Sequence, residues 1–293
     1  MKAFNIQKIL IPIDFSETSM LAIEHAGFTA QLFKAELVLL HVIEKHWEQF
    51  SVVAPELRIS TPTELTGAIE KKLSEVAADI QKKYGVKSLH VTSTGNIFSE
   101  ILSVSKEHNV DLVVMGTHGT SGVVEFFIGS NTYKMVTQSE CPVMSVQAHA
   151  KKLGFTNILL PIDDSVHSRQ KVNQAIVLAK HFASKIHILG LADSNDESDR
   201  KKFEIKLDQI EEYVKKCDLP FSRKTVDGKN QSKTTYDYAK AVNADLIVIM
   251  TDQDENLTGR FMGTFAQQII NHSKIPVLTI QPKEANTPWV HPY

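Results

Sequence analysis

Short runs of apolar, often β-branched residues alternate along this chain with longer segments in which apolar positions recur every three or four residues. The short runs predict buried strands, and the longer segments predict helices. In the first half, the predicted strands are 8–13, 36–42, 87–93, 111–115 and 143–147, and the predicted helices are 16–33, 61–83, 97–108 and 130–139. The second half follows the same order. This alternation predicts an α/β fold in which helices cover both faces of a parallel sheet.

The chain also repeats itself. Ile9–Asp14 recurs as Ile158–Asp163 at an offset of 149 residues, whereas Asp111–Val114 recurs as Asp245–Val248 at an offset of 134. The first half is therefore longer by 149 − 134 = 15 residues, which we assign to residues 45–61. These matches predict two homologous domains, 1–148 and 155–283, joined by a short polar linker.

Composition narrows the class of protein. The 293 residues carry 32 Lys and Arg against 34 Asp and Glu, so the net charge of −2 gives no overall reason to bind nucleic acid or an anionic membrane. No apolar run approaches the roughly 18 residues of a membrane span, and the N-terminus lacks the pattern of a secretory signal. Cys141 and Cys217 form no CxxC pair. We expect a cytoplasmic protein with reduced thiols.

The segment with the clearest chemistry follows the fourth predicted strand. Gly116 and Gly119 lack Cβ atoms, so the backbone there can take positive φ and approach a ligand closely. Gly129 and Ser130 then open a helix whose N-terminus favours an anion. Ligands of open α/β sheets bind at the carboxyl ends of strands. The segment suits a polyphosphate, and the alternative is that the glycines serve only the turn from strand to helix.

The spacing Gly116, two residues, Gly119, nine residues, Gly129-Ser130 resembles the nucleotide-binding signature of the universal stress protein family. The segments Ile11–Ser16 and Glu140–Val143 are also similar to that family, and the resemblance covers nearly the whole chain as two copies. It implies two tandem, doubly wound, Rossmann-like domains, each with a five-stranded parallel sheet, in a stress-response protein. It also implies ATP as the ligand, and whether Mg²⁺ accompanies the ATP stays open.

In the ATP-binding branch of the family, the resemblance places the nucleoside against Asp14 and the adenine against the main chain of Val42. It places the ribose and phosphates among the glycine-rich residues. The expected nucleotide-binding set is Pro12, Ile13, Asp14, Val42, Met115, Gly116, His118, Gly119, Gly129, Ser130 and Asn131. Asp14 has the alternative of capping the next turn, Val42 that of core packing, and His118 that of an idle exposed side chain.

The second half departs from this pattern. Met250 and Gln253 stand where the first half has Gly116 and Gly119, and the loop that follows is acidic. Because carboxylates repel phosphate, we expect nucleotide binding only in the first half. The acidic loop has the alternative of binding a cation.

The sequence does not decide whether the protein is an enzyme. The dinucleotide fingerprint, the GxxxxGK[ST] loop and the GxSxG elbow are all absent, which favours a regulatory protein with at most slow ATP hydrolysis. The second hypothesis is an assembly or adaptor protein in which both nucleotide sites are vestigial.

The resemblance further implies that the two domains pair through their last strands, 143–147 and 277–281, which would put an interface between chains into one chain. Homo-oligomerisation stays open. Residues 45–61 contain several large apolar side chains and follow the strand of Val42, so we expect them to fold over the site or onto the other domain.

Overall fold

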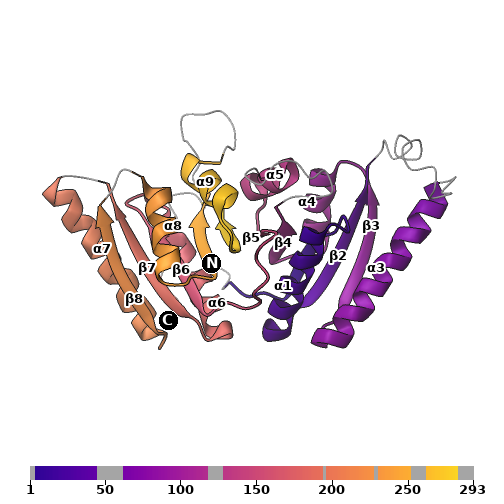
Figure 1. Ribbon diagram of the computed structural model, residues 1–293, viewed down its shortest axis with the longest axis horizontal. Coiled ribbons are helices and arrows are strands. Elements are labelled where there is room, and N and C mark those ends of the chain that lie inside the picture. The colour runs from indigo at the N-terminus through magenta and orange to yellow at the C-terminus, as the bar shows by residue number, and fades with distance from the viewer. Residues whose placement is uncertain are drawn as a thin grey trace.

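The structure is a computed structural model that describes residues 4–44, 62–117, 128–193, 196–227, 230–251 and 262–282. Its centre is one ten-stranded sheet in the order β3-β2-β1-β4-β5-β10-β9-β6-β7-β8 (Figure 1). The strands are β1 (Lys8–Pro12), β2 (Glu36–Ile43), β3 (Ser88–Thr94), β4 (Leu112–Gly116), β5 (Val143–Val146), β6 (Asn157–Ile162), β7 (Lys185–Ala192), β8 (Phe221–Asp227), β9 (Leu246–Met250) and β10 (Val277–Ile280). Within each half all neighbouring strands are parallel, and β5 and β10 are antiparallel.

Helices cover both faces of this sheet. The described helices are α1 (Glu17–Phe33), α3 (Pro62–Tyr84), α4 (Ile97–Glu107), α5 (Ser130–Gln138), the 3₁₀ helix η2 (Ser168–Lys171), α6 (Val172–Phe182), α7 (Glu197–Lys216), α8 (Gln231–Ala241) and α9 (Thr264–His272). The expected fold class, two doubly wound domains with five parallel strands each, is confirmed. One boundary differs between the halves: α1 begins directly after Ser16, whereas α6 begins only after η2.

Two buried cores follow from the alternation of side chains along each strand. Ile9 and Ile11 of β1 join the core under α1, α3, α6 and α7, and Leu10 joins the core under α4, α5, α8 and α9. Each core contains residues of both halves, so the cores run across the whole molecule. The near-continuous apolar pattern of strands such as β4 is what burial on both faces requires.

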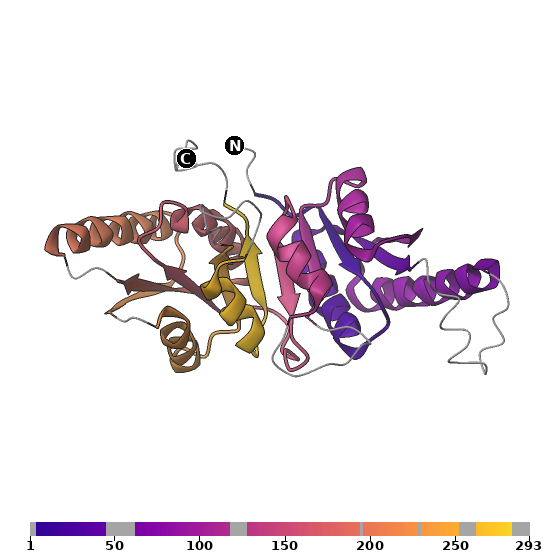
Figure 2. The same ribbon diagram turned by 90° about the horizontal axis from the view of Figure 1, so that it is seen from above.

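The junction of the two halves is a pseudo-two-fold. Met144 of β5 pairs with Leu278 of β10, its own equivalent at the offset of 134, so the axis passes through this pair. Side-chain hydrogen bonds obey the same symmetry: Ser145 Oγ donates to Val277 O at 3.3 Å, and Thr279 Oγ1 donates to Val143 O at 2.9 Å. The view along the axis shows α5 and α9 on either side of the junction (Figure 2). These are the two strands that the sequence analysis pairs.

The repeated aspartates have a structural role. Asp111 Oδ2 accepts hydrogen bonds from the backbone N–H groups of Gln7 and Lys8 at 2.8 and 3.0 Å. In the second half, Asp245 accepts in the same way from Thr156 and Asn157. Each aspartate stands just before β4 or β9 and holds the chain entering the adjacent β1 or β6. The repeated aspartate therefore makes the same structural contact in both halves.

A cluster of aromatic rings joins the halves on the opposite face from α5 and α9. Phe28 and Phe33 of α1 lie 6.1 and 6.4 Å from the ring of Phe182 of α6, centroid to centroid. Phe155, at the end of the linker, lies 4.7 Å from Phe182. Gly154 has φ of +77°, and a Cβ there would come within 2.9 Å of Phe28. The linker is therefore packed against both halves.

His25 of α1 lies beneath this cluster and is 1% exposed. Its Nε2–H donates to Ala150 O at 2.6 Å, and no described residue binds Nδ1. Burial lowers the pKa of His25, against the opposing effects of the Ala150 carbonyl and Glu24.

We expect this histidine to make the fold sensitive to acid. The pKa of His25 is lower in the folded than in the unfolded chain, where it is near 6.5. The free energy of unfolding should therefore be highest above pH 6.5 and should fall as the pH drops toward the folded pKa, by at most about 1.4 kcal/mol per pH unit. Urea denaturation of the wild type and His25→Gln between pH 7.5 and 5.5 checks this. The variant should have a flatter profile, and identical slopes would contradict the assignment.

Candidate functional site

The candidate site lies at the carboxyl ends of β1 and β4. These two strands are neighbours, and the chain leaves β1 toward β2 on one side while β5 lies on the other side of β4. This reversal of strand order is where open α/β sheets bind ligands. Because β5 and β10 are antiparallel, the carboxyl ends of the strands in the second half point toward the opposite edge of the sheet. The two halves therefore present separate candidate sites.

Asp14 builds the turn that follows β1. Its Oδ1 accepts from Ser16 N at 3.0 Å and from Ser16 Oγ at 2.6 Å, and the Ser16 hydroxyl in turn caps α1 at Ser19 N. Phe15, between them, has φ of 63°, a left-handed conformation that a non-glycine residue adopts at a cost. The turn-capping role of Asp14 is thus present in the structure. Contact of Asp14 with a nucleoside stays a prediction.

His41 lies beside the candidate site, and the sequence analysis did not select it. It lies on β2 beside Val42, its Nδ1–H donates to Ile13 O at 2.7 Å, and its ring stacks on Phe15 at 5.2 Å. Burial lowers the pKa of His41, and nearby Lys72 lowers it further against the opposing Ile13 carbonyl and Asp14. The lowered pKa favours the neutral ring, and the hydrogen bond of His41 to Ile13 O holds the exit of β1. A histidine inside an otherwise apolar strand was the signal available in the sequence.

Pro12, Ile13, Val42 and Met115 of the expected set lie at or near the carboxyl ends of β1, β2 and β4. Ile13 N donates to Leu40 O at 2.7 Å, which extends the pairing of Pro12 with β2 by one residue. Val42 is half-buried and packs on the core under α4 and α5, and Met115 is buried in the same core. The side chains of Val42 and Met115 serve packing, and contact of their backbone groups with a ligand stays a prediction.

Gly116 has a packing reason for lacking a side chain. A Cβ there would come within 2.8 Å of Thr18 Cγ2 and 3.1 Å of the Thr18 backbone on α1. Its φ is not positive, so the conformational freedom expected from the sequence is not used at this position. The Gly116 carbonyl accepts from Thr132 Oγ1 of α5 at 2.9 Å. Gly116 thus lets α1 approach the end of β4, and its carbonyl oxygen binds α5.

The N-terminus of α5 completes the site. Gly129 is its N-cap residue and provides no side-chain hydrogen bond, so the N–H groups of the first turn, from Ser130 and Asn131 onward, have no side-chain cap from that position. Gly129 N donates to Thr117 O at 2.8 Å, and a Cβ on Gly129 would meet this oxygen at 3.0 Å. The start of α5, which carries the positive end of the helix dipole, is therefore fixed at the end of β4.

Some sequence predictions fall outside the described residues. These are the roles of His118 and Gly119, the folding of residues 45–61 over the site, and the acidic loop that contains Gln253. Among the residues that the structure does describe, no group of three or more His, Cys, Asp and Glu side chains could hold a metal ion. The described helices include none that is long and apolar enough to span a bilayer.

In the second half, the equivalent turn is bound by the protein's own lysine. Lys206 Nζ of α7 donates to the carbonyl oxygens of Asp163, Asp164 and Ser165 at 3.3, 2.6 and 3.1 Å. The equivalent lysine of the first half, Lys72, lies instead 5.3 Å from the centroid of the Phe15 ring. Where the first half has His41, the second has Gly190, and a Cβ there would come within 2.6 Å of Leu207.

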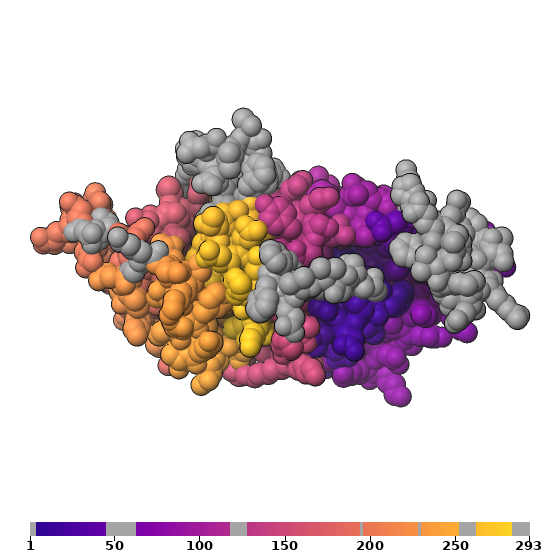
Figure 3. Space-filling model, turned by 45° about the horizontal axis from the view of Figure 1, so that its top comes forward, coloured from indigo at the N-terminus to yellow at the C-terminus, as the bar shows by residue number. Residues whose placement is uncertain are grey.

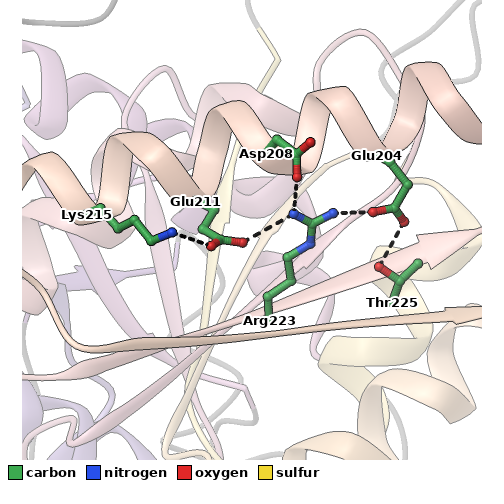
Figure 4. A network of polar contacts seen from close by, with 6 residues as sticks. All are labelled: Glu204, Asp208, Glu211, Lys215, Arg223 and Thr225. Carbon is green, nitrogen blue, oxygen red and sulfur yellow. Dashed lines mark hydrogen bonds and ion pairs between the residues drawn. The ribbon is translucent and has the colours of Figure 1, made fainter.

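An ion-pair network sets the position of α7. Arg223 of edge strand β8 binds Glu204, Asp208 and Glu211, which lie along one face of the helix (Figure 4). The Arg223 Nη1 to Asp208 Oδ1 distance is 2.5 Å, and Thr225 Oγ1 also donates to Glu204, at 3.1 Å. This network fixes the helix that carries Lys206.

A second lysine lies beside the same turn. Lys171 is only 3% exposed and its Nζ donates to Ser168 Oγ at 3.1 Å, while Ser168 Oγ accepts from Asp163 N at 3.0 Å. Burial raises the pKa of Asp163, but Lys171 and the hydrogen bonds from Ser165 and Ser168 outweigh this and hold the pKa below its usual value. Asp163, the equivalent of Asp14, therefore serves an internal charge network.

The fold and site define a tandem pair of doubly wound α/β domains with candidate ligand sites at the carboxyl edges of their strands. A model of the universal stress protein family matches the chain twice, over residues 5–147 and 154–281. The chain therefore belongs to the universal stress protein family, with two copies of the domain.

Individual relatives agree with this assignment. A universal stress protein of Methanocaldococcus jannaschii is 29% identical over 154 residues, which cover 48% of this chain and 94% of that protein. One of Bacillus subtilis is 33% identical over 148 residues, or 48% of this chain and 98% of that protein. The crystal structure of a universal stress protein from Archaeoglobus fulgidus has the same fold, with a TM-score of 0.74 at 19% identity over 96% of this chain and 99% of that one.

Proposed function

We propose that this member of a stress-response family binds one nucleotide, ATP, at the carboxyl edge of its N-terminal half and acts as a nucleotide-responsive regulatory protein. The observation that carries the proposal is the contrast between the two halves. In the second half Lys206 binds the turn after β6, and Met250 stands where Gly116 ends β4. In the first half, the turn of Asp14 and the start of α5 are built from the residues that the family resemblance assigns to ATP.

The proposal also covers the domain bounds, the location of the protein and the backbone contacts with the nucleotide. We propose that the domains are residues 1–148 and 155–283 and that their pairing through β5 and β10 persists in solution. We propose a reducing, cytoplasmic location, in keeping with the unpaired thiols of Cys141 and Cys217. Any Mg²⁺ would arrive with the phosphates. Pro12, Ile13, Val42, Met115 and Asn131 would contribute backbone contacts.

Isothermal titration of ATP into the full chain tests the proposal. We expect one ATP per chain. Two equivalent sites would contradict the assignment to the N-terminal half. No binding would favour the adaptor hypothesis, in which both sites are vestigial.

A matched pair of substitutions locates the site. Ser130 and Thr264 are equivalent, exposed first residues of α5 and α9. A carboxylate at either position interacts favourably with the positive end of the helix dipole. Neither Ser130→Asp nor Thr264→Asp should therefore reduce stability. Ser130→Asp should lower ATP affinity roughly 10- to 100-fold, about 1.4–2.8 kcal/mol, because it repels the phosphates. Thr264→Asp should leave affinity within twofold, and equal effects of the two would refute the proposed site.

A further inference from the structure

Each half of the molecule holds one backbone N–H of the other at the start of a helix. Ile128 N donates to Asn271 Oδ1 of α9 at 2.8 Å, and Met262 N donates to Tyr133 Oη of α5 at 3.4 Å. Ile128 and Met262 are equivalent at the offset of 134, and each directly precedes the N-cap glycine of its helix. The space-filling view shows the yellow surface of the α9 region against the magenta surface of the N-terminal half (Figure 3).

The two acceptors are not equivalent residues. The counterpart of Asn271 is Thr137, whose hydroxyl donates to the carbonyl oxygens of Tyr133 and Lys134 within its own helix. The counterpart of Tyr133 is Gln267. The contact made to the N-terminal half is also the shorter, at 2.8 against 3.4 Å, and it uses an amide oxygen, which can only accept. The N-terminal helix start is therefore held more firmly across the junction than its counterpart.

This contact acts on the backbone that the proposed site uses. Gly129 N is held by Thr117 O of the same half, and the adjacent Ile128 N is held by Asn271 of the other half. Two consecutive N–H groups are thus fixed from two sides just before α5, and Thr132 Oγ1 ties the first turn to Gly116 O. The direction of the Ser130 and Asn131 N–H groups depends on this arrangement.

We propose that Asn271 of the C-terminal half is a positioning residue for the nucleotide site of the N-terminal half. The proposal rests on the function proposed above. By fixing Ile128 N, Asn271 preorganises the first turn of α5 for an anion, so the half that lacks a nucleotide site contributes to the affinity of the half that has one. By linkage, nucleotide bound at α5 strengthens the contact between the halves to the same degree.

The test uses the full chain, ATP as the probe and three variants. Asn271→Leu removes the acceptor at similar volume and should lower ATP affinity roughly three- to tenfold, which corresponds to the loss of one hydrogen bond. Tyr133→Phe removes the reciprocal acceptor and should leave ATP affinity within twofold. Asn271→Asp keeps an acceptor oxygen, but its charge also acts on phosphate, so it is compared by amide exchange alone.

Amide hydrogen exchange at Ile128, without ATP, measures the contact itself. Exchange should be at least tenfold faster in Asn271→Leu than in the wild type, and near the wild-type rate in Asn271→Asp and Tyr133→Phe. Normal ATP binding by the wild type with unchanged affinity in Asn271→Leu would overturn the proposal, even if that variant is less stable. No ATP binding by the wild type would overturn the proposed function and the affinity role together, and the exchange rates would still report whether the contact exists.

Discussion

Replacing Phe155 by alanine is expected to lower the free energy of unfolding by about 3–5 kcal/mol, the usual cost of removing a fully buried aromatic ring. Phe155 is 2% exposed and packs at 4.7 Å on Phe182 and at 6.2 Å on His25, centroid to centroid. It is the repeat equivalent of Ile6, which is buried to the same extent. Because the ring stands between α1 and α6, its loss removes contacts from both halves at once.

Urea denaturation followed by circular dichroism measures this loss. The control is Leu89→Ala on edge strand β3, where the side chain is 48% exposed and a change within about 0.5 kcal/mol is expected. A similar, small effect of both substitutions would show that the aromatic cluster does not stabilise the junction. Separate unfolding transitions for the two halves in Phe155→Ala alone would identify this ring as the contact that makes unfolding cooperative.

The substitution Lys171→Met should lower the free energy of unfolding at pH 7 by roughly 3 kcal/mol. Removing one member of a buried charge network leaves the other without compensation, which costs about 3–5 kcal/mol. The lower end applies because Asp163 is partly exposed and keeps Lys206 nearby. Lys180→Met, at an exposed position of α6, which follows η2, should change stability by less than about 0.5 kcal/mol.

The pH dependence of the stability lost in Lys171→Met tests whether Asp163 is the partner of Lys171. The pKa of Asp163 is lowered in the fold, so its stabilising contribution is present above the unfolded value near 3.9 and is lost as the pH falls through the folded value. Without Lys171 that pKa rises, and the cost of the substitution should shrink as Asp163 becomes protonated. A cost that stays constant from pH 7 to pH 3 would show that Lys171 acts through packing instead.

The sequence predicted the fold well because its signals are local or repeated. The apolar runs that form β1 and β4, and the Ser16 cap of α1, act over a few residues and need no knowledge of distant contacts. The late start of α6 was missed because its cause is distant. A side chain at the end of β4 would strike the first turn of α1, and the second half, with Met250 at that position, has η2 instead of a regular first turn.

The candidate site was predicted in part for the same reason. Asp14 and Gly129 stand at ends of elements that the periodicity defines, so their placement follows from the order of strands and helices. His41, Lys206 and Asn271 act through residues that are 28, 42 and 143 positions away in the chain. Gly116 was selected for a freedom of φ that it does not use, since its need for glycine comes from Thr18 of the neighbouring helix.

The antiparallel pairing of β5 with β10 has a consequence for how the protein responds to its own abundance. The two strands belong to one chain, and the partner strand is therefore always present at an effective concentration of roughly millimolar or more. Dilution cannot separate the halves. A cell that makes less of this protein reduces the number of assembled units without reducing the fraction that is assembled, so the contact between Asn271 and Ile128 is present at every expression level.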